Sequence, residues 1–538
     1  MRIGLEGQYA GNAVQQINGL KPGYYSVEAD TLNDGKQKYC YIYGRGTGQD
    51  KCMTAVPRTI KEEQWTKVTV RGIKVETDGQ MEVGVCTDGD DRNVHIDNVS
   101  LQYEANQDKP FEMLNGGCIG WLDWIEDLGG KYYYSDGTEG DALQILAESG
   151  FNFVRLELYN NPGEHVKNGE MFPKGYKDPD GIFRLAVRAR DKGMKIQLSF
   201  MYSDYWENEA IPYDWLEKIE ELDDNDEIAD ILSECIYTYT RDYLKRLADA
   251  GIYPEFISLG NEMQEGILRP YGRTCEDECK LNNFCKFMAA GYKAVKEVSP
   301  GSKVVLHIAC NADDMHKKDR VWTGRWFFDM CRDQGIQYDV IGTSFYPFWA
   351  QKDEEGVIKP ALDVNDFREW CNMMIDIYDK DILIMETGIN WGTPGQLENN
   401  GAYEGIYPYS PEGQRDYMYE LINGVKSVKD GRCVGILYWD PVLVHQEGAG
   451  YAVDAVTGEG RPNCVETTTL FDYDHKALPV LDAYRYNTVS DGSVAVYGVA
   501  KDDAGNILAN SRVEVTHNGK TYSVNTDRYG GYYTRVFE

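Results

Sequence analysis

The sequence has no uninterrupted apolar stretch of about 18 residues, so it predicts no membrane-spanning helix. Basic residues are scarce, because 55 Lys and Arg stand against 88 Asp and Glu and leave a formal net charge of −33. A chain this acidic repels phosphate backbones and anionic membranes, which disfavours nucleic acid as a partner. The first residues also lack the apolar core of a secretory signal, although the chain reads as if it begins inside a folded module.

No zinc-binding pattern is present. The 13 cysteines are an odd number, which excludes a fully paired disulfide framework, and the densest group (Cys275, Cys279 and Cys285) lacks the spacing of paired zinc ligands. Acidic clusters at 88–91 and 223–227 lack the glutamate that closes an EF-hand loop. We therefore expect no cofactor. Solvated surface is the preferred interpretation of these clusters, with a structural calcium ion as the alternative.

Both ends of the chain have an all-β pattern. Residues 1–105 alternate β-branched and aromatic runs with Gly, Asp and Asn turns, which predicts a β-sandwich. Short phrases at 17–25 and 95–101 resemble jelly-roll carbohydrate-binding modules. Residues 488–538 resemble the small immunoglobulin-like β module often fused to secreted enzymes. About 50 residues make a thin core for such a fold, so we expect a shortened module.

The central segment, residues 111–486, has a different pattern. Short apolar runs suited to buried strands recur with helix-length, charged segments between them, as expected of an α/β protein. Eight such units are the number in a (β/α)8 TIM barrel. The predicted strands are 118–121, 153–158, 196–201, 256–262, 304–308, 340–346, 382–387 and 435–440.

Two glutamates directly follow apolar runs, Glu262 after the fourth predicted strand and Glu386 after the seventh. Reactive groups of such barrels lie where the strands end, all on one rim. A single glutamate at such a position caps a helix or pairs with a lysine about as often as it reacts. Two at these strand numbers, flanked by Asn261 and Trp391, predict a pair facing one bond.

A carboxyl pair of this kind suits a retaining glycosidase, in which the two groups stand about 5 to 5.5 Å apart. Glu262 would be the acid and then the base, and Glu386 the nucleophile. Repulsion and burial should raise the proton affinity of one carboxyl, while a nearby cation keeps the other charged. Arg155, in the second predicted strand, could supply that cation.

Tryptophans at or just beyond strand ends favour a sugar substrate. Indole rings pack on the flat C–H faces of pyranoses, and four such residues on one rim would line a cleft. Core or loop packing is the more common role for each one alone. The four are Trp206, Trp349, Trp391 and Trp439.

Several phrases in this order resemble the glycoside hydrolase family 53 endo-β-1,4-galactanases. They cover most of residues 115–485, and examples are 202–206 (Tyr-Ser-Asp-Tyr-Trp), 260–266, 339–349 and 385–387. The resemblance implies a retaining mechanism with Glu262 as acid/base and Glu386 as nucleophile. It implies that Asn261 binds the sugar 2-hydroxyl and that Arg155 and Tyr346 hold the nucleophile. Asp204, inside the first phrase, is also expected to bind substrate.

Departures from the family pattern concern the substrate more than the chemistry. Met201 stands where the family usually has a histidine, so the cleft floor is expected to differ. The leading prediction is hydrolysis of β-1,4-galactan, the alternatives being another β-linked plant polysaccharide or a barrel that binds carbohydrate without turnover. The expected partner is the polysaccharide alone. We expect a monomer that is secreted, periplasmic or on the cell surface.

Overall fold

The computed structural model describes most of the chain, with gaps at the loops and near both ends. The described residues are 2–3, 8–33, 39–48, 51–56, 65–90, 94–104, 113–206, 208, 210–275, 278–309, 323–346, 350–352, 358–360, 364–393, 409–426, 428–463, 465–485, 493–500, 502, 508, 511–517, 519–525 and 531–537.

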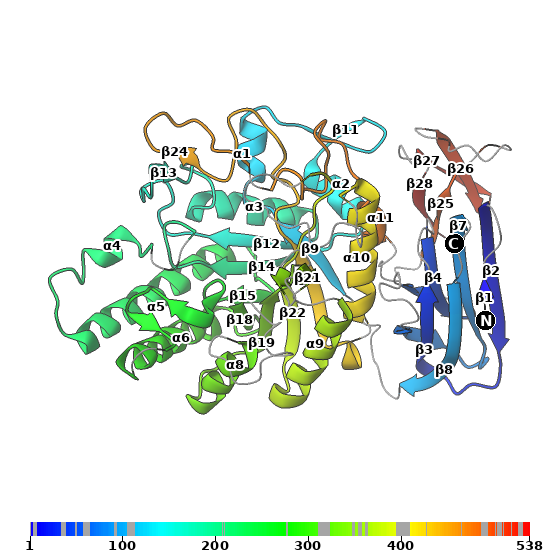
Figure 1. Ribbon diagram of the computed structural model, residues 1–538, viewed down its shortest axis with the longest axis horizontal. Helices are drawn as coiled ribbons and strands as arrows, with labels where there is room; N and C mark the ends of the chain where they lie inside the picture. The colour runs from blue at the N-terminus through cyan, green and yellow to red at the C-terminus, as the bar shows by residue number, and fades with distance from the viewer. Residues whose placement is uncertain are drawn as a thin grey trace.

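A closed barrel of eight parallel strands forms the centre of the molecule (Figure 1). The expected (β/α)8 barrel is therefore confirmed. Around the barrel the strands run in the order β9 (Leu114–Cys118), β12 (Phe153–Leu158), β14 (Lys195–Phe200), β15 (Phe256–Ser258), β18 (Lys303–Ile308), β19 (Val340–Ser344), β22 (Asp381–Glu386) and β23 (Cys433–Tyr438).

Helices surround this barrel, and several begin at side-chain caps that the sequence supplies. Asp141, Asp178 and Asp224 each accept a hydrogen bond from a backbone N–H in the first turn of the helix that follows. Asp224 belongs to the acidic cluster at 223–227, so helix capping gives that residue a structural role. The helices are α1 (Leu122–Asp127), α2 (Ala142–Glu148), α3 (Pro179–Asp191), α4 (Tyr213–Leu216), α5 (Asn225–Asp249), α6 (Glu278–Val298), α8 (Gly324–Asp333), α9 (Val364–Tyr378), α10 (Pro411–Lys426) and α11 (Leu481–Arg485).

The first barrel strand differs from its prediction, because β9 covers 114–118 and not 118–121. Its sequence, Leu-Asn-Gly-Gly-Cys, is not an apolar run. A Cβ on Gly116 would lie 2.0 Å from the Phe153 carbonyl oxygen, so only glycine fits between the neighbouring strands. Close backbone approach, and not hydrophobicity, selects the residues of this strand.

Two hydrophobic regions hold the barrel together. The larger one lies between the strands and the helices. A smaller one is made of residues from the barrel strands: Leu114, Phe153, Phe256, Val305, Val340, Leu383, Met385 and Leu437. In the described part of the chain, no helix is both long enough and apolar enough to cross a bilayer.

The loops of the barrel contain short two-stranded pairs and 3-10 turns. The two-stranded pairs are β10 (Tyr132–Tyr133) with β11 (Glu139–Gly140), β13 (Glu170–Met171) with β24 (Val453–Asp454), β16 (Gly266–Ile267) with β17 (Gly272–Arg273), and β20 (Ala350–Lys352) with β21 (Ile358–Pro360). Two 3-10 turns are η1 (Met263–Glu265) and η3 (Lys429–Gly431).

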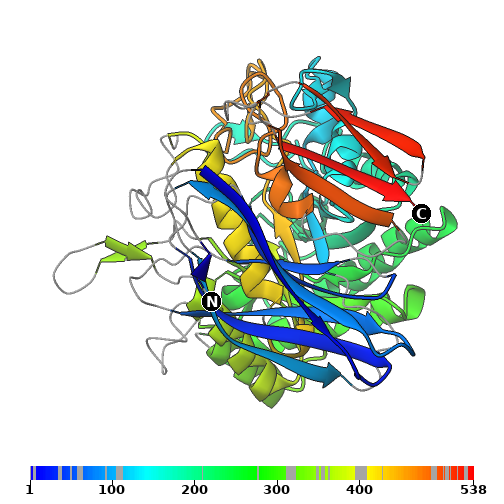
Figure 2. The same cartoon turned by 90° about the vertical axis from the view of Figure 1, so that its right-hand side faces the viewer.

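The N-terminal segment forms two four-stranded antiparallel sheets with the orders β1-β8-β3-β6 and β2-β7-β4-β5, which share a hydrophobic core of their own. Its β5 and β6 contact α10. Figures 1 and 2 show this segment and the C-terminal strands on the side of the barrel where α10 lies. The strands are β1 (Arg2–Ile3), β2 (Gln8–Ile17), β3 (Gly23–Asn33), β4 (Tyr39–Gly46), β5 (Cys52–Ala55), β6 (Thr66–Val75), β7 (Met81–Asp90) and β8 (Val94–Glu104).

The C-terminal strands form two pairs, β25 with β28 and β26 with β27. The immunoglobulin-like and jelly-roll assignments of the two flanking segments stay predictions. These strands are β25 (Ser493–Val499), β26 (Arg512–His517), β27 (Lys520–Asn525) and β28 (Gly531–Phe537).

Candidate active site

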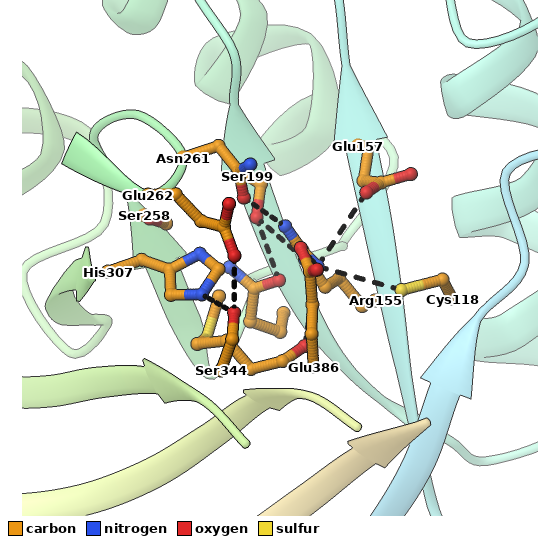
Figure 3. A network of polar contacts seen from close by, with 12 residues as sticks. Cys118, Arg155, Glu157, Ser199, Ser258, Asn261, Glu262, His307, Ser344 and Glu386 are labelled. Carbon is orange, nitrogen blue, oxygen red and sulfur yellow. Dashed lines mark hydrogen bonds and ion pairs between the residues drawn. The ribbon is translucent and has the colours of Figure 1, made fainter. Parts of the chain in front are cut away.

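Arg155 lies at the centre of a polar network inside the barrel (Figure 3). Its side chain projects from β12 and is fully buried. One terminal nitrogen donates to Glu386 Oε1 at 2.6 Å, and the other donates to Asn261 Oδ1 at 2.7 Å. The Nε–H donates to Ser199 at 3.1 Å. The guanidinium therefore orients two predicted site residues from different strands at once.

Glu386 is the last residue of β22 and is 7% exposed. Besides Arg155, its carboxylate accepts a hydrogen bond from the Tyr346 hydroxyl at 3.0 Å. Burial raises the pKa of Glu386 above its ordinary value, while the Arg155 charge and the two hydrogen bonds oppose that rise. Both carboxylate oxygens thus have donors that favour the ionised form.

Glu262 lies across from Glu386, just after β15, and is only partly buried. Its backbone has the left-handed φ of 43°, which is uncommon for glutamate, and its side chain points toward Ser344 and Glu386 (Figure 3). Ser344 donates a hydrogen bond to Glu262 Oε1 at 2.7 Å. Burial and the charge of Glu386 raise the pKa of Glu262 to about 7.

The two glutamates face one another, and one carboxylate oxygen of each lies within 4.8 Å of the other (Figure 3). This separation matches a retaining pair and not the roughly 6.5 to 9.5 Å of an inverting pair, which must leave room for a water molecule. Their environments differ as well, because Glu386 is bound to a buried cation, whereas Glu262 has no ion pair with any cation in the described part of the chain. One proton shared by the pair is therefore best placed on Glu262.

The predicted tryptophans are only partly brought together. Trp206 and Trp439 pack edge to face with ring centroids 6.2 Å apart. Trp391 instead packs on Tyr473 at 5.0 Å. Trp349 lies outside the described residues.

Asp204 is fully buried and binds backbone groups. Its carboxylate accepts hydrogen bonds from the N–H groups of Asn161 at 2.7 Å and Tyr213 at 3.2 Å. Burial raises the pKa of Asp204 to about 6. These contacts hold two loops together. Met201 is also buried, within the larger hydrophobic core.

A second buried charge cluster was not predicted. Lys177 donates to Glu157 at 2.5 Å, and Asp440 is buried nearby with no hydrogen-bond partner for either carboxyl oxygen among the described residues. Burial raises the pKa of Asp440 to about 7. Glu157 is two residues from Arg155 in the same strand, so the strand period could have indicated a shared face. Lys177 comes from a loop, and no sequence pattern indicated that it would lie near Glu157.

His307 and Ser344 are further site residues that sequence reasoning missed. His307 Nε2 lies 2.9 Å from the hydroxyl of Ser344, the residue that donates to Glu262. Both residues lie within predicted strands and resemble ordinary parts of a buried strand.

Among the described residues, two groups of three side chains are close enough to hold a metal ion, Glu262 with His307 and Glu386, and Cys118 with Glu157 and Asp440. One glutamate of each group already pairs with a buried cation, since Arg155 binds Glu386 and Lys177 binds Glu157. These cations provide the charge compensation that a metal would give.

Residues 114–484, more than half of the chain, match the family model described as Glycosyl hydrolase family 53. This chain belongs to family 53. It is thus a glycoside hydrolase, and the resemblance is confirmed. Its sequence is 28% identical over 379 residues to the arabinogalactan endo-beta-1,4-galactanase of Thermothelomyces thermophilus, covering 68% of this chain and 98% of that protein.

Solved family 53 structures agree. The catalytic domain from Ignisphaera aggregans is 30% identical with a TM-score of 0.58, covering 71% of this chain and 98% of that one. A structure of fungal beta-1,4-galactanases is 27% identical with a TM-score of 0.54, covering 69% and 98%. The family therefore accounts for the barrel and leaves the flanking strands outside the match.

Proposed function

We propose that this protein is a retaining endo-β-1,4-galactanase that hydrolyses the unbranched galactan of type I arabinogalactan and pectic side chains. The observation that carries the proposal is the pair of carboxylates within 4.8 Å, one held by buried Arg155 and the other with a pKa near 7. Retention is general in family 53. Relatives named arabinogalactan endo-beta-1,4-galactanase support galactan as the polymer.

In the first step, a carboxylate oxygen of Glu386 bonds to the anomeric carbon while the bond to the leaving oxygen breaks. Glu262 gives its proton to that oxygen, which departs as a sugar hydroxyl. In the second step, ionised Glu262 takes a proton from water, the water oxygen bonds to the anomeric carbon, and the bond to Glu386 breaks. The enzyme is regenerated with the proton back on Glu262.

Other residues of the site hold the reacting groups. Arg155 and Tyr346 each donate to a different oxygen of Glu386, which orients the nucleophile and keeps it ionised. Arg155 also fixes the amide oxygen of Asn261, leaving the amide nitrogen to bind the 2-hydroxyl of the attacked sugar. These steps use only side chains of this chain, so we expect a chelator to leave kcat unchanged.

Aromatic residues would form the sugar-binding walls. The edge-to-face pair of Trp206 and Trp439 presents a rigid apolar corner for a pyranose ring. Trp391 and Trp349 are proposed to contact further sugar units. Asp204 would fix the conformation of the loop beside this corner through its hydrogen bonds to backbone N–H groups.

The decisive experiment measures reducing ends released from galactan, mannan, xylan and glucan by the wild type and by Glu386→Gln. We expect products from galactan alone and a loss of at least about a thousandfold in the variant. Glu148→Gln on the exposed face of α2 is the matched control and should retain full activity.

Each alternative has its own outcome in this assay. Release of reducing ends from mannan but not from galactan would overturn galactan as the proposed substrate. The replacement of the usual histidine by Met201 is the specific reason to test other polymers. Binding of galactan without turnover by the wild type would favour a non-catalytic barrel.

We further propose three units, a jelly-roll carbohydrate-binding module at 1–105, the catalytic barrel at 111–486 and a shortened immunoglobulin-like module at 488–538. The first has its own hydrophobic core and an exposed Trp65 beside His95, suited to sugar packing. Trp65→Ala should weaken retention on insoluble galactan and leave turnover of soluble chains intact. Loss of soluble activity would instead show a structural role.

A polysaccharide is too large to diffuse into a cell, which supports action in a secreted, periplasmic or surface-bound location. That the protein is a monomer stays a separate expectation. Size-exclusion chromatography with light scattering and fractionation of the source organism would test both expectations.

A further inference from the structure

His307 is fully buried in β18 and reaches the site through Ser344. The Ser344 hydroxyl lies between the ring, 2.9 Å from Nε2, and Glu262 Oε1 at 2.7 Å. Figure 3 shows the Ser344 hydroxyl joined by hydrogen bonds to both the His307 ring and the Glu262 carboxylate, and we call this series of three side chains the row. The row ends at His307, because its Nδ1 is buried without a hydrogen-bond partner among the described residues.

The ring of His307 is neutral, since burial and the nearby Arg155 charge hold its pKa well below the ordinary value. A neutral imidazole has one N–H and one bare nitrogen, so two tautomers compete. If Nδ1 carried the hydrogen, a buried N–H would lack an acceptor among the residues that the structure describes. If Nε2 carries it, that N–H donates to Ser344, and only a lone pair on Nδ1 is left without a partner. A donor without a partner is the rarer and costlier case, so the surroundings select the Nε2–H form.

This tautomer gives the row a direction. A hydroxyl has a single hydrogen, so a Ser344 oxygen that accepts from His307 has its own hydrogen free to donate to Glu262. With the other tautomer, Ser344 would donate to His307 and could only accept from a protonated Glu262.

We propose that His307 is a positioning residue for the reaction, and that its Nε2–H commits the Ser344 hydroxyl to donate to Glu262, which stabilises the ionised carboxylate that activates water. The inference rests on the proposed acid/base role of Glu262. It adds a function for two residues that the proposed reaction steps do not use: they oppose the groups that favour the protonated carboxyl.

The protonation of Glu262 depends on groups that come from several barrel strands. Burial and the Glu386 charge from β22 favour the protonated form, whereas Ser344 and the Arg155 charge from β12 favour the ionised form. Tyr346 also lies close enough to Glu262 to feel its charge. Without the hydrogen bond from Ser344, burial and the Glu386 charge should outweigh the remaining groups. The pKa of Glu262 should therefore rise.

The test has two spectroscopic readouts that need no substrate. In the wild type, ¹⁵N spectra should show His307 with a hydrogen on Nε2 and a bare Nδ1, the signal being assigned by its loss in His307→Leu. The ¹³C titration of the Glu262 carboxyl should move up by about one pH unit in Ser344→Ala, the value of one hydrogen bond to a charged group. His307→Leu should move it in the same direction by less.

His307→Gln is the conservative variant, because its amide can place an N–H where Nε2–H stood. It should titrate close to the wild type and so separate the donor from the shape of the ring. Thermal melting of each variant checks folding, and Glu262→Gln identifies the carboxyl signal.

Activity completes the experiment. On galactan, the basic limb of kcat/KM should follow the titration and move to higher pH in Ser344→Ala and His307→Leu. A hydrogen on Nδ1, or a Glu262 titration that is unchanged in folded Ser344→Ala, would overturn the positioning role. Titrations that move as expected in an enzyme without galactan hydrolysis would instead refute the proposed function and leave the hydrogen-bonded row supported.

Discussion

Replacing Arg155 by lysine tests whether the geometry of the guanidinium, beyond its charge, organises the site. Arginine donates at once to Glu386 at 2.6 Å, to Asn261 at 2.7 Å and to Ser199 at 3.1 Å. A lysine ammonium at the end of a flexible stem is a point charge and cannot reproduce this planar fork. We expect it to keep the pairing with Glu386 and to leave Asn261 without its donor.

The size of the effect follows from the hydrogen bonds that lysine cannot make. Each hydrogen bond that involves a charged group contributes about 1.5 to 3 kcal/mol, and 1.36 kcal/mol changes a rate tenfold. Removal of the hydrogen bond to Asn261 alone predicts a fall in kcat/KM of roughly tenfold to a hundredfold. Misorientation of Glu386 as well would bring the fall to about a thousandfold or more.

The assay is kcat/KM for soluble galactan across pH, together with thermal melting. Arg188→Lys is the matched control, because Arg188 pairs with Asp123 and Glu126 between partly exposed helices outside the barrel. The control should stay within about twofold of the wild type, since exposed pairs contribute little. A folded Arg155→Lys enzyme that also retained more than half of wild-type kcat/KM would refute the reasoning.

Three further predictions concern single side chains. Tyr346→Phe removes the 3.0 Å hydrogen bond to Glu386 and should lower kcat by about tenfold to a hundredfold while moving the acidic limb of the pH profile upward, because the ionised nucleophile loses a donor. Glu262→Ala should lose polymer hydrolysis but keep part of its activity on an aryl galactoside with a good leaving group, and added azide should yield a β-galactosyl azide; no azide product would contradict the acid/base assignment. Asp440 has a pKa raised to about 7, so its ionisation costs stability as pH rises from about 4 through 7, and Asp440→Asn should gain more melting temperature relative to the wild type at pH 8 than at pH 5. Equal differences at both pH values would show that Asp440 is already charged or uncoupled from folding.

Sequence patterns located most of the barrel because strands of a parallel sheet are buried on both faces and read as continuous apolar runs. Glu262 and Glu386 were found in the same way, because a charged residue directly after a continuous apolar run is not expected in a hydrophobic core. The pattern failed at β9, where packing against Phe153 demands glycine in place of apolar side chains.

The rest of the site depended on three-dimensional contacts that no local pattern records. His307 and Ser344 lie inside ordinary strand sequences, and only the folded barrel places them in line with Glu262. Lys177 reaches Glu157 from a loop 20 residues further along the chain. Family resemblance assigned roles to single positions, whereas the folded structure reveals how one residue, Arg155, serves two of them.

The left-handed backbone of Glu262 has a consequence for engineering. A non-glycine residue in this conformation carries a conformational cost of about 1 to 2 kcal/mol, and this one also holds a partly buried acid opposite another. Asparagine tolerates the left-handed region and brings no charge. Laboratory selection for heat resistance alone is therefore expected to enrich Glu262→Asn, which would be more stable but catalytically inactive. Each round of such a selection should therefore also measure turnover.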